Sequence, residues 1–175
     1  LKVHEIACSI LEAVAEDDDL ADEISSTVYE FLRLFCVNHP KNQRTLYTSS
    51  FLLLFARQLP DDQGAAQLLC AMFENNYDLC SGNNFQFLQQ LVDTLMKHPA
   101  VTSRCMDCLT TLVVVDGAPV HGNQQQILQI LVAEHGGCLQ KMQNMTTLPR
   151  SERRQLCSVV ELLCTCCTES TAHLA

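Results

Sequence analysis

Tryptophan is absent from this chain of 175 residues, and positive charge is scarce. Only 11 Lys and Arg residues stand against 20 Asp and Glu residues, which gives a net charge of −9, and the basic residues are scattered along the chain. Nucleic acid and anionic membrane surfaces attract proteins through clustered cations. The composition therefore argues against both as direct partners.

Long apolar runs are absent as well. No stretch approaches the roughly 20 apolar residues that a membrane span requires, so we expect contact with a membrane only through a larger parent protein. Apolar residues nevertheless make up 47% of the chain and charged residues 18%, which is typical of a folded domain. We expect residues 1–175 to form one domain and, because the chain begins at Leu1 instead of Met, to be a fragment of a larger protein.

The chain has 11 cysteines, but their arrangement does not indicate a disulfide framework. Most of them occupy apolar positions of helical patterns, where a thiol serves as a small hydrophobic group. An odd number of cysteines in a chain that is long enough to bury a core points to a reducing compartment. We therefore expect a cytosolic domain.

Apolar residues recur at helical spacing through most of the chain. The clearest stripes run from Val28 to Cys36, Phe87 to Leu95, Cys105 to Val113, Ile127 to Leu131 and Val159 to Cys167. Short breaks rich in Gly, Pro, Asn and Asp separate them. The pattern predicts an all-α fold of about eight helices, arranged as an irregular armadillo-like α-solenoid of helix hairpins.

Two further helices are predicted over Leu46–Leu59 and Ala65–Leu79. The β-branched run Val113–Val115 is the only ambiguous segment, and we interpret it as a continuation of the helical stripe before it. No alternation typical of a strand persists elsewhere for more than a few residues.

The signs of chemistry in the sequence are weak. Cys105 and Cys108 have the C-x-x-C spacing of zinc and redox sites, but a structural zinc site needs four ligands. The segment Cys164–Cys167, or His121, would have to complete it, and core thiols are the favoured interpretation. No Ser-His-Asp or Cys-His arrangement stands out, so we predict neither an enzyme nor a cofactor.

Two other kinds of binding site are also disfavoured. The acidic run Glu16–Asp19 lacks the alternating ligands and the central glycine of a calcium-binding EF-hand loop, so we expect solvated loop residues and helix caps. The stretch "VVVDGAPVHGNQQQIL" (Val113–Leu128) has glycines but no phosphate-loop Lys, and its flanks are helical.

We interpret the same stretch as a sharp corner between two helices. Gly117 and Gly122 would supply backbone freedom, Pro119 lies between them in the turn, and Asn123 and Gln124 would open the next helix. These five residues would set the angle between successive helix pairs.

Several segments, in order, resemble the homology domain shared by inositol trisphosphate receptors and ryanodine receptors, and the former more closely. They are "FCVNHPKNQRTLY" (Phe35–Tyr47), "MFENNYDLC" (Met72–Cys80), "FLQQLVDTL" with "CMDCLTTLVVVDGAPVHGNQQQIL" (Phe87–Leu128), and "VVELLCTCCTES" (Val159–Ser170). The resemblance spans about Val28 to Ser170. Asp116-Gly117 matches the family's turn, and Asn123-Gln124 matches the pair that opens its next helix.

This resemblance implies a non-catalytic module of a calcium-release channel, on the cytosolic face of the endoplasmic reticulum membrane. Its partners would be other domains of the same channel, neighbouring subunits of a homotetramer, and regulatory proteins. The module would transmit rearrangements from the ligand-binding region to the pore. The alternatives are a free-standing armadillo-like adaptor that binds a protein in its concave groove, and a cysteine-based metal or redox protein.

Overall fold

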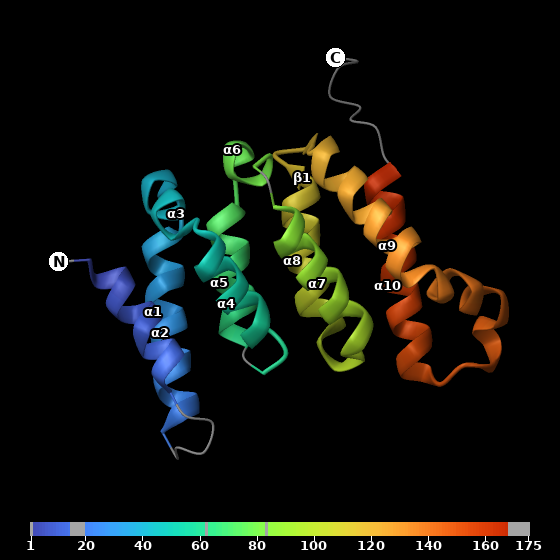
Figure 1. Ribbon diagram of the computed structural model, residues 1–175, viewed down its shortest axis with the longest axis horizontal. Coiled ribbons are helices and arrows are strands. Elements are labelled where there is room, and N and C mark those ends of the chain that lie inside the picture. Colours follow the sequence, from blue (N-terminus) through green and yellow to red (C-terminus); the bar gives the residue numbers. More distant parts are fainter. Residues whose placement is uncertain (1, 15–19, 62, 83, 168–175) are drawn as a thin grey trace.

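The computed structural model describes residues 2–14, 20–61, 63–82 and 84–167, and helices dominate them (Figure 1). The predicted all-α class is confirmed, and eight of the described helices have ten residues or more. These are α1 (Val3–Ala13), α2 (Ala21–Cys36), α4 (Ser49–Gln58), α5 (Gln63–Phe73), α7 (Phe85–Lys97), α8 (Thr102–Val113), α9 (His121–Lys141) and α10 (Arg150–Cys167). The acidic run Glu16–Asp19 lies outside the described residues.

The long helices form hairpins that stack side by side in two layers. Helices α2, α5, α8 and α10 pack in that order and form what we call the second layer. Helices α4, α7 and α9 pack in that order in the first layer, and α1 joins them because the Gln58 side chain donates to the Leu11 carbonyl. The stack advances along the sequence from α1 to α10 (Figure 1).

The chain returns from the second layer to the first at one end of the stack, the upper end in Figure 1, and each return carries a small element. Helix α3 (Pro40–Leu46) joins α2 to α4, and helix α6 (Tyr77–Cys80) joins α5 to α7. The strands β1 (Val114–Val115) and β2 (Ala118–Pro119) form a hairpin between α8 and α9. We call these three returns the junctions.

The long helices of both layers bury their apolar stripes against one another. The predicted stripe Phe87–Leu95 is buried on α7, and so is the stripe Cys105–Val113 on α8. Each fully buried large apolar side chain contributes about 1.5–3 kcal/mol, so these stripes supply much of the stability. On α2, the buried positions include Tyr29 and Leu32, whereas Phe31 of the predicted stripe remains partly exposed.

Three predicted helix boundaries are wrong for local reasons. The segment Leu46–Leu59 is not one helix, because the Thr48 hydroxyl accepts from the Phe51 amide and starts α4 anew. Helix α5 ends at Phe73, since Asn75 takes a left-handed φ of 55°. Helix α8 ends at Val113, and Val114 and Val115 pair with Pro119 and Ala118 as a strand.

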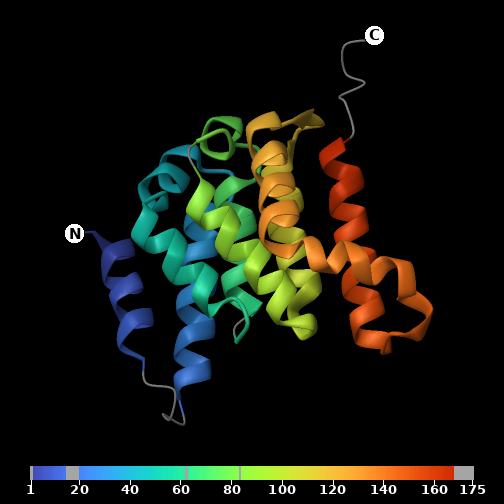
Figure 2. The ribbon, with the colours of Figure 1, turned by 45° about the vertical axis from the view of Figure 1, so that its right-hand side comes forward.

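The far end of the stack departs from straight helices. Helix α9 is kinked at His135, whose φ of −121° is not helical, and Figure 2 shows the bend toward the 3-10 helix η2 (Met142–Thr147). A second 3-10 turn, η1 (Pro99–Val101), leads from α7 into α8. None of the described helices combines the length and apolar character that a membrane span needs.

Candidate functional site

The predicted corner at Gly117 is a tight β-hairpin turn. Asp116 and Gly117 have φ values of 50° and 77°, the two positive angles of a type I′ turn, for which Asp-Gly is a favoured pair. A Cβ on Gly117 would meet nothing within 4 Å, so space does not require a glycine there. The backbone angle does.

The other two small residues of the corner play lesser roles. Pro119 lies in β2 and pairs with Val114 across the hairpin. Gly122 lies in the first turn of α9 with an ordinary helical φ, and a Cβ there would also meet open space. The prediction that Gly122 supplies backbone freedom is therefore wrong.

Asn123 is the central polar residue of this junction. Its side chain is 1% exposed, and its amide nitrogen donates to the carbonyls of Cys80 at 2.7 Å and Leu112 at 2.8 Å. Leu112 lies in the last turn of α8, where carbonyls have no partner within the helix. Asn123 therefore caps the helix before it and also ties α9 to α6.

Gln124 reaches across to the next helix pair. Its amide nitrogen donates to the carbonyls of Val113 at 3.3 Å and Thr165 at 3.5 Å, the latter on α10. Its amide oxygen lies 3.2 Å from Nδ1 of His121. One buried side chain thus bridges the end of α8 and the end of α10.

A second Asn-Gln pair makes equivalent hydrogen bonds at the first junction, which the sequence prediction did not include as a site. Asn42 and Gln43 are the third and fourth residues of α3, as Asn123 and Gln124 are of α9. The Asn42 side chain donates to the Phe35 carbonyl near the end of α2, at 2.8 Å. The Gln43 side chain donates to the Ala71 carbonyl of α5, at 2.9 Å. In both pairs, Asn holds the preceding second-layer helix and Gln reaches the following one.

The middle junction connects the two pairs. The Asn76 side chain donates to the amide oxygen of Gln43 at 2.7 Å, and its own oxygen accepts from the Leu79 amide. The Asn84 side chain donates to the Cys80 carbonyl at 3.0 Å, which is the carbonyl that Asn123 also contacts. We call Gln43, Asn76, Asn84, Asn123 and Gln124, all buried, the amide chain.

The amide chain has no acid–base chemistry of its own, because side-chain amides do not titrate at physiological pH. One phenol extends it, since the hydroxyl of Tyr47 donates to Asn84 at 2.6 Å. Burial raises the pKa of Tyr47, and the nearby Cys80 adds to this effect. The phenol therefore stays protonated as a donor. The arrangement positions helices and offers no nucleophile or proton acceptor.

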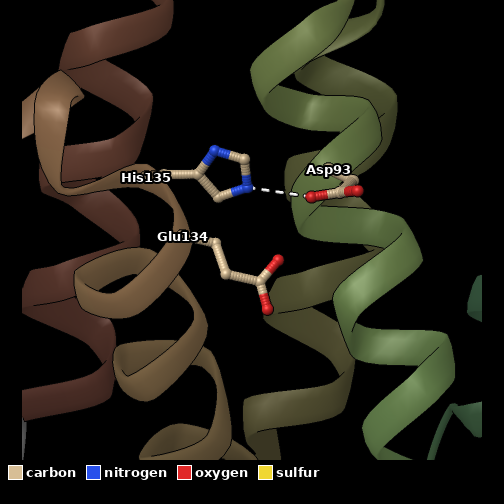
Figure 3. Close-up of side chains that lie close together, drawn as sticks. All are labelled: Asp93, Glu134 and His135. Carbon is tan, nitrogen blue, oxygen red and sulfur yellow. Dashed lines mark hydrogen bonds and ion pairs between the residues drawn. The ribbon is translucent and has the colours of Figure 1, made fainter.

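A second polar cluster joins α7 to α9 within the first layer, near the kink of α9 (Figure 3). Nε2 of His135 lies 2.9 Å from Asp93 on α7, and the other oxygen of Asp93 accepts from Lys97 at 2.8 Å. Glu134 points toward the same place, and both of its oxygens accept from the Gln89 side chain. Partial burial raises the pKa of Asp93, but the Lys97 and His135 contacts outweigh it and leave the pKa below the ordinary value.

This cluster is also the only group of three metal-ligating side chains in the described part of the chain whose ligand atoms lie within 4.8 Å of one another. One imidazole and two carboxylates suit a divalent cation. Each of the three side chains already has a protein partner, and the ammonium of Lys97 opposes a further positive charge. The geometry explains how α9 is held against α7 at its kink.

The alternative zinc site is not assembled. Cys105 and Cys108 are buried on α8, and they form no group of three ligands with Cys164–Cys167 or His121 within the residues that the structure describes. Desolvation raises the pKa of Cys105 to about 12. Cys166 packs into the core, whereas Cys164 and Cys167 face outward on α10.

Comparison with known families agrees with this architecture. The sequence model described as RYDR_ITPR, RIH domain, matches residues 3–143. The match starts earlier than the resemblance that begins near Val28, because it includes α1, and it ends before α10. It contains all three junctions and the whole amide chain. RIH domains are non-enzymatic parts of channel proteins. The chain therefore belongs to the RIH-domain family, the homology domain of the inositol trisphosphate and ryanodine receptor calcium-release channels.

Proposed function

We propose that the chain is a non-catalytic coupling module of a ligand-gated calcium-release channel, which transmits conformational change from the ligand-binding region to the pore. The observation that carries the proposal is the amide chain. It connects the junctions α3, α6 and β1–β2, and together with the neighbouring Asn42 its hydrogen bonds reach from α2 to α10. A displacement of one helix pair is then resisted, and passed on, by the next pair.

Buried amides suit this role for a physical reason. All of them except Asn76 donate to main-chain carbonyls, and Asn76 donates to the Gln43 side chain. A sliding helix pair would leave buried carbonyls without partners, at about 1–3 kcal/mol each. Packed interfaces with such a penalty shift between discrete arrangements instead of deforming continuously. Within this proposal, Gly117, Pro119, Asn123 and Gln124 set the angle between α8 and α9.

The same proposal places the module on the cytosolic face of the endoplasmic reticulum membrane, within a homotetramer. Its partners are then other domains of the channel, the neighbouring subunits and regulatory proteins. We also propose that residues 1–175 act as one domain. The Gln155 side chain of α10 supports this, because it donates to the Leu95 and Met96 carbonyls at the end of α7.

The experiment compares the full-length protein carrying Asn123→Ala with one carrying Gln125→Ala, an exposed neighbour on the same helix turn. We expect Asn123→Ala to lower the fraction of channels that open at saturating ligand, while ligand still binds. Gln125→Ala should leave both quantities unchanged. If Asn123→Ala opens as fully as the wild type, the coupling role is refuted.

A second candidate function rests on a groove of about 820 Å³ along α2, α5 and α8. Its lining includes small side chains such as Ala66 and Ala71, together with Glu74 and Asp107. A free-standing adaptor would bind a protein segment there. The hydropathy of the complete gene product separates the two functions, because membrane spans support the channel and their absence supports the adaptor.

A further inference from the structure

Two thiols from neighbouring helices face each other in the second layer. The Sγ atoms of Cys70 on α5 and Cys108 on α8 lie 4.0 Å apart and share a hydrogen bond. Cys108 also contacts the Ala66 carbonyl, at 3.7 Å. The two cysteines are 38 positions apart in sequence, so their contact is a product of the fold.

Cys70 is accessible from outside and Cys108 is not. Cys70 is half-buried and lines the 820 Å³ groove beside Arg104, Asp107 and Thr111. Cys108 is 2% exposed. A small oxidant that enters the groove therefore meets Cys70 first, with Cys108 directly behind it.

Cys70 also differs from the core cysteines in acidity. Burial raises the pKa of Cys8, Cys36 and Cys80 to about 12, which makes these thiols inert. At Cys70, the hydrogen bond shared with Cys108, helped by the nearby Thr111 side chain, outweighs desolvation and lowers the pKa. Cys70 is thus the more nucleophilic partner, and the pKa of Cys108 is raised correspondingly.

We propose that Cys70 and Cys108 form a reversible redox site, at which glutathione disulfide oxidises the pair to an intramolecular disulfide that locks α5 to α8. The thiolate of Cys70 attacks one sulfur of glutathione disulfide, which forms a mixed disulfide and releases one glutathione thiolate. The sulfur of Cys108 then attacks Sγ of Cys70, and the second glutathione leaves. Two electrons pass from the protein to the oxidant, and the two thiol protons end on two molecules of reduced glutathione.

The geometry requires only a small movement. A disulfide needs an S–S distance of about 2 Å, and the two sulfurs start 4.0 Å apart on helices that already pack together. The pair differs from the C-x-x-C of Cys105 and Cys108, in which both thiols belong to one helix and Cys105 has no access to the groove. The spacing in the sequence therefore points to the wrong partner for Cys108.

The test uses a background in which the three exposed cysteines, Cys157, Cys164 and Cys167, are replaced by Ser. The folded protein is incubated with glutathione disulfide, alkylated, digested without reduction and analysed by mass spectrometry. We expect one cross-linked peptide pair that contains Cys70 and Cys108, lacks two hydrogens, and disappears after excess reduced glutathione.

Single variants assign the order of the steps. Cys108→Ser should accumulate a glutathione adduct on Cys70, and Cys70→Ser should give neither a cross-link nor an adduct on Cys108. Cys105→Ser is the matched control and should cross-link like the background. The proposal is overturned if the background protein stops at a stable adduct on Cys70, or if Cys70 does not react. That digest is decisive even where a variant fails to fold.

Discussion

Removal of the Asn123 side chain is the sharpest perturbation of the amide chain. Asn123→Ala deletes one amide that donates to two carbonyls, those of Cys80 and Leu112. The two carbonyls differ in whether another hydrogen-bond donor remains after the substitution. The Cys80 carbonyl keeps its bond from Asn84, whereas no other side chain donates to the Leu112 carbonyl among the described hydrogen bonds.

The expected loss follows from this difference. A buried carbonyl left without a partner costs about 1–3 kcal/mol, and loss of one of two hydrogen bonds costs about 0.5–1.5 kcal/mol. We therefore expect the free energy of unfolding to fall by about 2–4 kcal/mol. Domains are stable by only about 5–15 kcal/mol, so this is a large fraction of the total.

Urea unfolding followed by circular dichroism measures the change. With a slope of about 2 kcal/mol per molar, the midpoint should fall by about 1–2 M. Gln125→Ala, next to Asn123 but exposed, should change the free energy by less than about 0.5 kcal/mol. If the two variants unfold at the same urea concentration, the structural role assigned to Asn123 is wrong.

Three further perturbations address the turn, the middle junction and the kink. Gly117→Val should lower the free energy of unfolding by about 1–2 kcal/mol and the melting temperature by about 2–8 °C, because a β-branched residue resists the φ of 77°. Unchanged stability would refute the corner role of Gly117. Gly82→Ala should lower the free energy of unfolding by about 1–2 kcal/mol in thermal melts, since the new Cβ displaces the Tyr47 hydroxyl from its hydrogen bond with Asn84. Most of this loss should vanish in a Tyr47→Phe background, and a loss that persists there contradicts the mechanism. Asp93 has a lowered pKa, so its stabilisation is present above pH ~4 and is lost as the pH falls through its folded pKa. Between pH 6 and pH 3, the free energy of unfolding should therefore fall by about 0.2–1 kcal/mol less for Asp93→Asn than for the wild type, as measured by thermal melts. Equal decreases would exclude the ion pair as a stabilising contact.

Helical periodicity predicted the fold class well because burial itself follows the helical period. The stripes Phe87–Leu95 and Cys105–Val113 are buried as the spacing indicates. The hairpin at Val114–Val115 was missed, since strands of two residues are too short to show alternation. Asp116-Gly117 between apolar residues is itself a hairpin signal, and it outweighs the β-branched continuation of α8.

The amide chain was only partly predictable. Asn123 and Gln124 were identified, and the second Asn-Gln pair at Asn42-Gln43 was visible in the sequence as a repeat of the same dipeptide. Asn76 and Asn84 carry no such signal. Their partners are main-chain carbonyls and another amide, and the fold alone brings these together.

The central claim is that the amide chain joins the junctions into one cooperative unit, and hydrogen exchange tests it most directly. Exchange is compared residue by residue between the wild type, Asn123→Ala and Gln125→Ala under native conditions. The claim predicts that Asn123→Ala speeds exchange in α6, at the end of α8 and near Thr165 on α10, as well as in α9. Faster exchange confined to the first turn of α9 would contradict it.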